Sequence, residues 1–257
     1  MSHYPLEDVR STESAEPWLT VGRHCFRSRL IVGIEQYDSI PLIRQVLEAS
    51  DADIFITTVD PDGMRSSLLL SDLADEVPLE KYTWVGTTSF ARSADGALRT
   101  VDILRRTCAI EIIKLDVRTQ DNRPQNQQTI KVAEQLLADG LTVLPFILPD
   151  PRDARRLEEA GCAAIRVMAS PVGSGLGITD APALRQIIEQ CQVPVIIEGG
   201  LGTAHHVSLA MELGAAAVLV NTALASARHP ALMAAAMKHA AAAGRLAHQS
   251  EPALCVA

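Results

Sequence analysis

Residues 109–116, Ala-Ile-Glu-Ile-Ile-Lys-Leu-Asp, form a short apolar run that ends in a lysine and a carboxylate. The run predicts a buried strand with Lys114 near its C-terminal end and Asp116 two residues further on. A charged amine on a buried strand is costly, so one interpretation is that Lys114 extends to solvent or pairs with an acid. The other is an amine whose pKa burial depresses, so that it can attack a carbonyl and form an imine.

Similar apolar runs recur along the chain and alternate with segments that predict helices. Together with residues 109–116 they predict eight strands, at 29–33, 53–58, 82–86, 109–116, 141–146, 163–168, 193–198 and 215–220. Continuous apolar strands separated by helices are typical of a parallel sheet covered on both faces. We therefore predict an α/β fold, a (β/α)8 TIM barrel. An open doubly wound sheet is the alternative, but its GxGxxG motif is missing after the first strand.

The chain of 257 residues has the length of one large α/β domain or two small ones. Residues 1–17 are polar and acidic, and we expect a flexible N-terminal tail there. We expect residues 18–257 to form a single barrel domain. A small hairpin is predicted over residues 19–25, and a helix around residues 67–74.

Composition narrows the classes of function. The net charge of −8 disfavours nucleic acid as a partner. No apolar run is long enough to span a membrane, and the N-terminus lacks the apolar segment of a signal peptide, so we expect a cytoplasmic protein. The five cysteines are scattered without a CxxC motif, so we predict no metal site, no disulfide framework and no cofactor. The large apolar fraction is compatible with a homo-oligomer.

The active site of such a barrel lies at the C-terminal ends of its strands. Lys114 and Asp116 end the fourth predicted strand, Arg166 lies near the end of the sixth, and Glu198 ends the seventh. An amine beside two carboxylates suggests Schiff-base chemistry, with Asp116 and Glu198 moving protons. The alternative for each acid is a structural salt bridge with a lysine or arginine. Arg166 is a candidate for substrate binding.

Glycine-rich segments follow the last predicted strands. Residues 199–203 come after the seventh strand, and Asn221 and Thr222 come after the eighth. Barrels often hold a phosphate between these two loops, where backbone N–H groups at helix N-termini face the anion. We predict a phosphate site there, formed by Gly200, Gly202, Asn221 and Thr222. The alternative is that the glycines only form tight turns. A further loop that begins at Gly173 is either a third wall of the site or a plain flexible loop.

The second half of the chain, residues 131–245, resembles the bacterial thiazole synthases. The similarity is carried by segments such as Pro-Val-Gly-Ser-Gly at 171–175, Met-Glu-Leu-Gly-Ala at 211–215 and Asn-Thr-Ala at 221–223. The resemblance implies an imine between the barrel lysine, here Lys114, and deoxyxylulose phosphate. It also implies a partner, a small ubiquitin-like sulfur carrier protein whose C-terminal thiocarboxylate supplies sulfur.

The chain departs from the thiazole synthase pattern at the expected mouth of the barrel. Asp116 replaces the usual glutamate, and Glu-Gly-Gly at 198–200 replaces Asp-Ala-Gly. Residues 86–90 and 122–125 also differ, and Arg166 stands where an apolar or small residue is usual. The polar substitutions suit a longer, more hydroxylated sugar phosphate. The chain is thus more similar to the 2-thiosugar synthase branch of antibiotic biosynthesis, which inserts sulfur at C2 of glucose 6-phosphate.

Three other functions remain open at this point. The first is thiazole synthesis from 1-deoxy-D-xylulose 5-phosphate for thiamine. The second is a lysine isomerase or aldolase that transfers no sulfur. The third is a binding protein that keeps the barrel without catalysis, although the retention of Lys114 between two acids argues against it.

Overall fold

The computed structural model describes residues 16–37, 39–59 and 77–250. Residues 1–15 of the predicted tail lie outside this part of the chain, as do the predicted helix at 67–74 and the last seven residues. The division into a tail and one barrel domain therefore stays a prediction.

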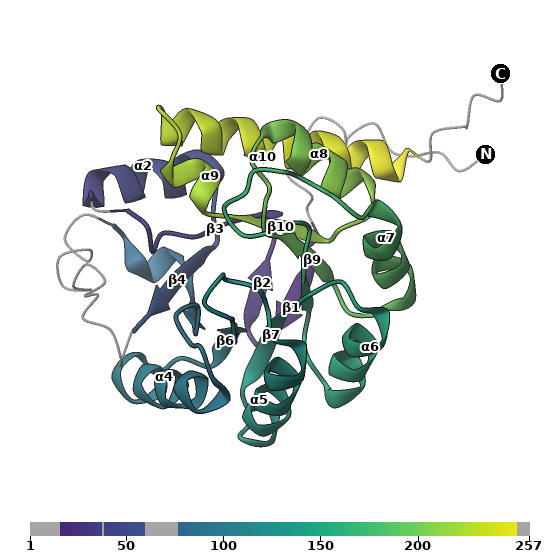
Figure 1. The fold of residues 1–257 in the computed structure, drawn as a ribbon. Helices are drawn as coiled ribbons and strands as arrows, with labels where there is room; N and C mark the ends of the chain where they lie inside the picture. The colour runs from purple at the N-terminus through teal and green to yellow at the C-terminus, as the bar shows by residue number, and fades with distance from the viewer. Residues whose placement is uncertain (1–15, 38, 60–76, 251–257) are drawn as a thin grey trace.

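The described residues form an eight-stranded parallel sheet that curves into a nearly closed barrel (Figure 1). The strands pair in the order β3-β10-β9-β8-β7-β6-β5-β4, and β3 and β4 contact each other where the two ends of the sheet meet. The prediction of a (β/α)8 TIM barrel is confirmed, and the open doubly wound sheet is wrong. The strands are β3 Leu30–Val32, β4 Ile54–Thr58, β5 Thr83–Thr87, β6 Ile112–Leu115, β7 Thr142–Ile147, β8 Ile165–Met168, β9 Val195–Glu198 and β10 Ala217–Val220.

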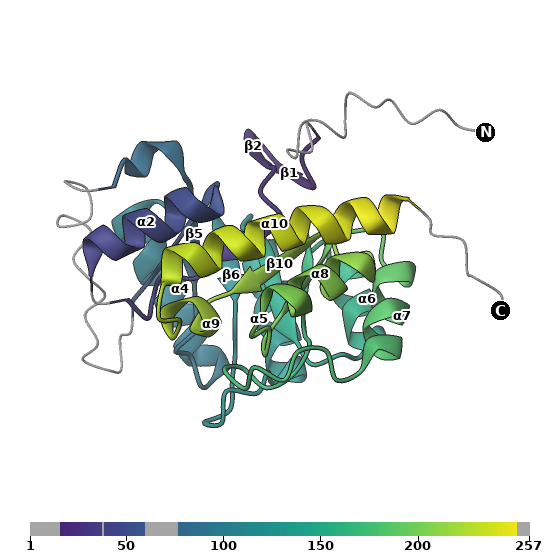
Figure 2. The same cartoon turned by 90° about the horizontal axis from the view of Figure 1, so that it is seen from above.

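Helices surround the barrel (Figures 1 and 2). Their ends follow local sequence signals: the side chain of Asp150 accepts hydrogen bonds from the first backbone N–H groups of α6, and Gly161 ends that helix at a φ of +102°. The helices are α2 Ile40–Ser50, α4 Ala94–Cys108, α5 Asn126–Ala138, α6 Pro151–Ala160, α7 Ala181–Gln190, α8 Ala204–Glu212, α9 Thr222–Ala225 and α10 Pro230–Gln249, with a 3-10 turn at Leu79–Lys81. None of these helices has the length and hydropathy to cross a membrane.

The predicted hairpin is present, as β1 Leu19–Val21 and β2 His24–Phe26. Figure 2 shows it at one end of the barrel. Trp18, Leu19 and Phe26 pack with the apolar side chains inside the barrel, such as Ile112 and Ile196. Among the described residues, the hairpin therefore closes the N-terminal end of the barrel, and the side chains at the opposite end, where the strands finish, are the candidates for a site.

The lysine strand is shorter than predicted. Ala109 adopts a left-handed backbone with a φ of +51° and caps α4, so the first residues of the apolar run belong to a turn. The last helix, α10, passes through Gly244 without a break. A Cβ atom at Gly244 would lie 2.3 Å from the backbone oxygen of Ser208, so this glycine lets α10 approach α8 closely.

Candidate active site

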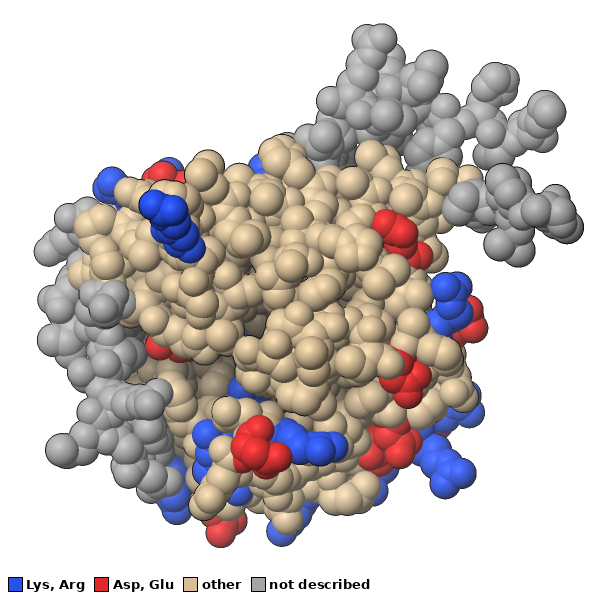
Figure 3. Space-filling view, turned by 45° about the horizontal axis from the view of Figure 1, so that its top comes forward, with Lys and Arg blue, Asp and Glu red and all other residues tan. Residues whose placement is uncertain are grey.

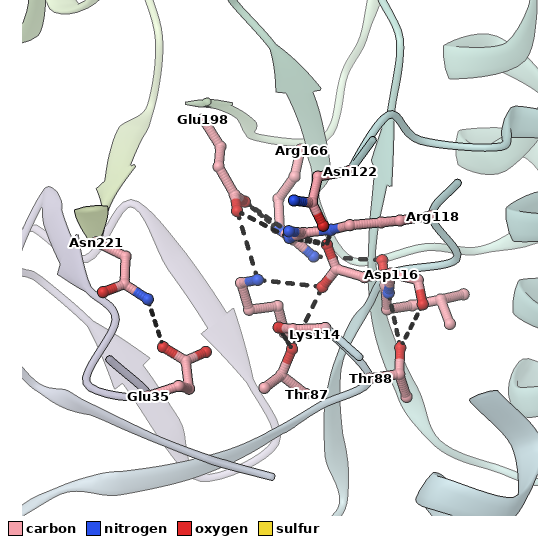
Figure 4. Close-up of polar contacts among 12 residues, drawn as sticks. Glu35, Thr87, Thr88, Lys114, Asp116, Arg118, Asn122, Arg166, Glu198 and Asn221 are labelled. Atoms are coloured by element: carbon pink, nitrogen blue, oxygen red, sulfur yellow. Dashed lines mark hydrogen bonds and ion pairs between the residues drawn. The ribbon is translucent and has the colours of Figure 1, made fainter. Parts of the chain in front are cut away.

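The C-terminal ends of β6, β8 and β9 bring five charged side chains together (Figure 4). We call Lys114, Asp116, Arg118, Arg166 and Glu198 the ionic cluster. Lys114 Nζ lies 3.1 Å from Asp116 Oδ2 and 3.4 Å from Glu198 Oε1. All five residues are at most 7% exposed. Lys114 therefore does not extend into solvent but pairs with the two acids predicted beside it.

Arg166 connects the two acids across the barrel. Its Nε donates to Glu198 Oε2 at 2.7 Å, and a terminal nitrogen lies 3.0 Å from Asp116 Oδ1. Its other terminal nitrogen donates to the backbone oxygen of Leu144 at 2.9 Å. The guanidinium also lies over the ring of Phe146, 5.0 Å from its centroid. Arg166 is thus enclosed in the ionic cluster, and its predicted contact with substrate stays a prediction.

Asp116 is fully buried and held in its ionised form. Burial alone would raise the pKa of its carboxyl group, but the positive charges of the three cations in the ionic cluster outweigh this and hold the pKa well below its usual value. The hydroxyl of Thr87 also donates to Asp116 Oδ2 at 3.3 Å. Thr88 fixes the backbone, because its Oγ1 donates to the oxygen of Asp116 and accepts from its N–H. These contacts suit an anchor of the cluster better than a proton carrier.

Arg118 is a site residue that was not among the candidates from the sequence. Its Nε and a terminal nitrogen donate to Asp116 Oδ1 at 3.1 and 2.7 Å, and it lies 3.7 Å from Glu198 Oε1. A signal was present, because Lys114, Asp116 and Arg118 follow each other at the two-residue spacing that places side chains on one face of a strand.

Glu35 is a second site residue that the sequence analysis missed. It follows β3, and its Oε2 accepts a hydrogen bond of 2.7 Å from Asn221 Nδ2. Next to it, Gln36 Nε2 donates to Thr222 Oγ1 at 3.2 Å. The position of Glu35 just after the first barrel strand could have revealed it, because all such positions face the mouth.

A cavity of about 350 Å³ opens beside the ionic cluster. It is lined by Glu198 and by residues of the loops after β8, β9 and β10. All five residues predicted in glycine-rich loops line it: Gly173, Gly200, Gly202, Asn221 and Thr222. The structure thus brings these candidates together next to a carboxylate that contacts Lys114. Figure 3 shows a hollow on this side of the molecule, with charged side chains gathered mainly along the lower edge.

Two of these glycines leave no room for a side chain. Gly200 has a φ of +66°, and a Cβ atom there would lie 1.7 Å from Ser170 Oγ. A Cβ atom at Gly202 would lie 2.8 Å from Gly175 Cα. The glycines therefore let the loops after β8 and β9 pack against each other and expose backbone to the cavity.

We expect Gly200→Ala to weaken the binding of inorganic phosphate at least about tenfold, because the added methyl group forces the two loops apart. Isothermal titration calorimetry measures the change. Gly140→Ala is the matched control: Gly140 also has a positive φ, of +78°, but no atom lies within 4 Å of the added Cβ. It should lose only about 1 kcal/mol of stability from backbone strain and keep its phosphate affinity. Equal phosphate affinity in the wild type and Gly200→Ala would contradict the prediction.

The described part of the chain contains no group of three or more His, Cys, Asp or Glu side chains that could hold a metal ion. The described site itself offers an amine, carboxylates and backbone N–H groups. A buried amine beside carboxylates and an anion-sized cavity can form an imine with a carbonyl compound.

Comparison with known proteins places this geometry in a family. The family model described as "Thiazole biosynthesis protein ThiG" matches residues 20–255. The thiazole synthase of Thioalkalivibrio sulfidiphilus is 38% identical over 238 residues, covering 91% of this chain and 90% of the relative. That of Pseudomonas paraeruginosa is 39% identical and covers 95% and 92%.

A solved structure, the BexX/CysO complex from Amycolatopsis orientalis, is more similar. It superposes with a TM-score of 0.92 at 62% sequence identity, covering 94% of this chain and 99% of the matched chain. The resemblance to thiazole synthases seen in the sequence is confirmed. The chain belongs to the thiazole biosynthesis protein ThiG family and is an enzyme of the thiazole synthase type.

Proposed function

We propose that this enzyme is a sulfur transferase that forms an imine between Lys114 and a phosphorylated sugar, with glucose 6-phosphate as the favoured substrate. Sulfur then comes from the C-terminal thiocarboxylate of a small carrier protein, and the product is a 2-thiosugar phosphate. The observation that carries the proposal is the position of Lys114, which is buried between Asp116 and Glu198, the second of which lines the glycine-rich cavity.

The charges of the ionic cluster are compatible with a neutral amine at Lys114. Arg118 and Arg166 alone balance Asp116 and Glu198, so loss of a proton from Lys114 leaves the buried group without net charge. Among the three basic side chains of the cluster only the amine can act as a nucleophile, because guanidinium groups stay protonated. The neutral amine attacks the sugar carbonyl, and the carbonyl oxygen leaves as water when the imine forms.

The next step needs a proton carrier that reaches the substrate. Glu198 lines the cavity and contacts Lys114, whereas Asp116 is fully buried and held ionised by its partners. We assign to Glu198 the removal of a proton from C2 of the imine and its return at C1. This moves the carbonyl to C2, where the thiocarboxylate sulfur can attack. Transfer of the carrier's acyl group from sulfur to the C2 oxygen lets the carrier leave as a carboxylate with that oxygen, so that sulfur stays on C2. The reverse proton shift restores the imine at C1, and its hydrolysis frees Lys114 and the 2-thiosugar phosphate. Asp116 is then the anchor that orients Lys114 and the two arginines.

Two observations favour a sugar phosphate other than deoxyxylulose phosphate. The residues that depart from the thiazole synthase pattern, Asp116, Arg166 and Glu198, are in contact with one another next to the cavity. The chain is also 62% identical to BexX but only 38 to 39% identical to the two proteins named thiazole synthase. Thiazole synthesis from 1-deoxy-D-xylulose 5-phosphate is the second candidate, which the names of those relatives and of the family model support.

The proposed protein partner is supported by the BexX structure, which is a complex with a second protein, CysO. We propose a carrier of that kind for this enzyme. A homo-oligomer and a cytoplasmic location remain predictions from the sequence.

The decisive experiment traps the imine. Incubation with glucose 6-phosphate and borohydride should add the mass of the reduced sugar phosphate to the peptide that contains Lys114. A parallel reaction uses deoxyxylulose phosphate. In separate reactions without borohydride, addition of a thiocarboxylated carrier should yield a thiosugar only from glucose 6-phosphate. Intact protein that forms no adduct with either sugar would contradict imine chemistry. An adduct and a thiazole formed only from deoxyxylulose phosphate would favour the second candidate.

A further inference from the structure

The three carboxylates near the mouth of the barrel differ in how their oxygens are used. Asp116 and Glu198 are each in contact with two or more cations of the ionic cluster. Glu35 is half-buried and accepts a hydrogen bond only through Oε2, from a neutral amide, among the described residues. Its Oε1 thus keeps the capacity to accept further hydrogen bonds.

Hydrogen bonds tie Glu35 and its neighbour to residues after β10 that line the cavity. Asn221, the partner of Glu35, lines the cavity, and the neighbouring pair of Gln36 and Thr222 ties the same two loops together. Gly33 packs directly on Asn221, since a Cβ atom there would lie 2.5 Å from the amide nitrogen. Figure 4 shows Glu35 and Asn221 together on one side of the site, with Lys114 and Glu198 on the other.

These contacts also change what the Asn221 side chain can do. One amide hydrogen is engaged by Glu35, and Oδ1 is buried without a hydrogen-bond partner in the described residues. An amide oxygen and a carboxylate are both acceptors, and acceptors do not bind a phosphate dianion. Both can act only toward hydrogen-bond donors, and the donors of a sugar phosphate are its hydroxyl groups.

We infer that Glu35 accepts a hydrogen bond from a hydroxyl group of the substrate, and that Asn221 is the residue that positions it. The inference rests on the proposed sugar phosphate substrate and adds the residue that recognises its hydroxylated part. The phosphate is left to the backbone N–H groups of the glycine-rich loops. A site that presents an unused carboxylate oxygen discriminates against a substrate without the matching hydroxyl, because the acceptor then stays unpaired.

The test compares binding of glucose 6-phosphate with binding of inorganic phosphate by calorimetry in the wild type, Glu35→Gln and Glu159→Gln. Glu35→Gln should weaken glucose 6-phosphate binding about tenfold or more, since hydrogen bonds to charged groups are the strong ones. Its affinity for inorganic phosphate should stay equal or increase, because a negative charge is removed. The exposed Glu159, on α6, serves as the control for loss of a surface carboxylate. Asn221→Ala should reduce glucose 6-phosphate binding in the same direction.

An equal change in both affinities in Glu35→Gln, or none, would overturn the inference, as would a wild type that does not bind glucose 6-phosphate. The proposed function fails separately. If the wild type binds glucose 6-phosphate with the expected dependence on Glu35 but borohydride traps nothing on Lys114, the imine mechanism is wrong and the role of Glu35 stands. Thermal unfolding of each variant shows that the fold is retained.

Discussion

Lys114→Ala is expected to abolish imine trapping and to lower the rate of sulfur transfer at least about a thousandfold, equivalent to about 4 kcal/mol of transition-state stabilisation. The reason is that no other amine lies in the ionic cluster: the remaining cations, Arg118 and Arg166, are guanidinium groups that do not act as nucleophiles. The measurement is the mass of the borohydride-treated protein together with product formation in the presence of the carrier.

The fold should survive this substitution, which makes its interpretation clear. Without Lys114, two guanidinium groups still balance two carboxylates, so no net charge is left buried. Lys114→Arg restores the positive charge but not the nucleophile, and it should be equally inactive. Lys131→Ala removes an exposed lysine from α5 and should react as the wild type does. Labelling of Lys114→Ala to the same extent as the wild type would show that the imine forms on another amine.

The barrel was predictable because its signal is repeated and local. Each strand is a continuous apolar run. The ends of the helices are marked by local capping residues, as Asp150 and Gly161 mark the start and the end of α6. Where the prediction was inaccurate, contacts remote in sequence or a backbone angle decided the outcome. The lysine strand is shorter than its apolar run because the left-handed backbone of Ala109 caps α4. A glycine usually weakens a helix, but Gly244 lies inside α10 because α8 packs closely against it.

The site was predictable only in part. The rule that strand ends face the mouth located Lys114, Asp116 and Glu198, but it does not say which charges touch. The position of Arg166 on its strand likewise did not show that it pairs with both acids. Arg118 and Glu35 lie just beyond strands in segments whose composition is that of ordinary polar loops. Their positions after β6 and β3 are visible in the sequence, but their partners are not. Arg118 contacts Glu198 of β9, and Glu35 contacts Asn221 after β10, so both contacts join residues far apart in the chain.

The largest loss of stability is expected from Arg166→Met. The arginine donates to both carboxylates of the cluster and to the backbone oxygen of Leu144, and it is 1% exposed. Methionine fills similar space but leaves Glu198 Oε2 without the donor that contacts it. Removal of one partner from a buried ion pair typically costs about 3–5 kcal/mol. For a domain of this size, each kcal/mol lowers the midpoint of thermal unfolding by about 2–4 °C, so we expect a decrease of roughly 10 °C.

The same substitution should make unfolding sensitive to acid at a higher pH. In the wild type the pKa of Asp116 is held below its usual value, so its contribution to stability is complete above about pH 4 and is lost as the pH falls through the lowered pKa. Arg166 is one of the three positive charges that lower the pKa of Asp116. Without it, the effect of burial, which raises this pKa, is less well balanced, and we expect the pKa of Asp116 to rise. Loss of stability on acidification should then begin at a higher pH than in the wild type.

Thermal unfolding measured between pH 3 and pH 8 tests both expectations together. Arg166→Lys keeps the charge but cannot reach both carboxylates at once, so its midpoint should lie between those of the wild type and Arg166→Met. Arg155→Met removes an exposed arginine from α6 and should leave the midpoint unchanged within about 1–2 °C. If Arg166→Met unfolds at the same temperature as Arg155→Met at every pH, the ionic cluster does not support the barrel, and the role of Asp116 as its anchor is wrong.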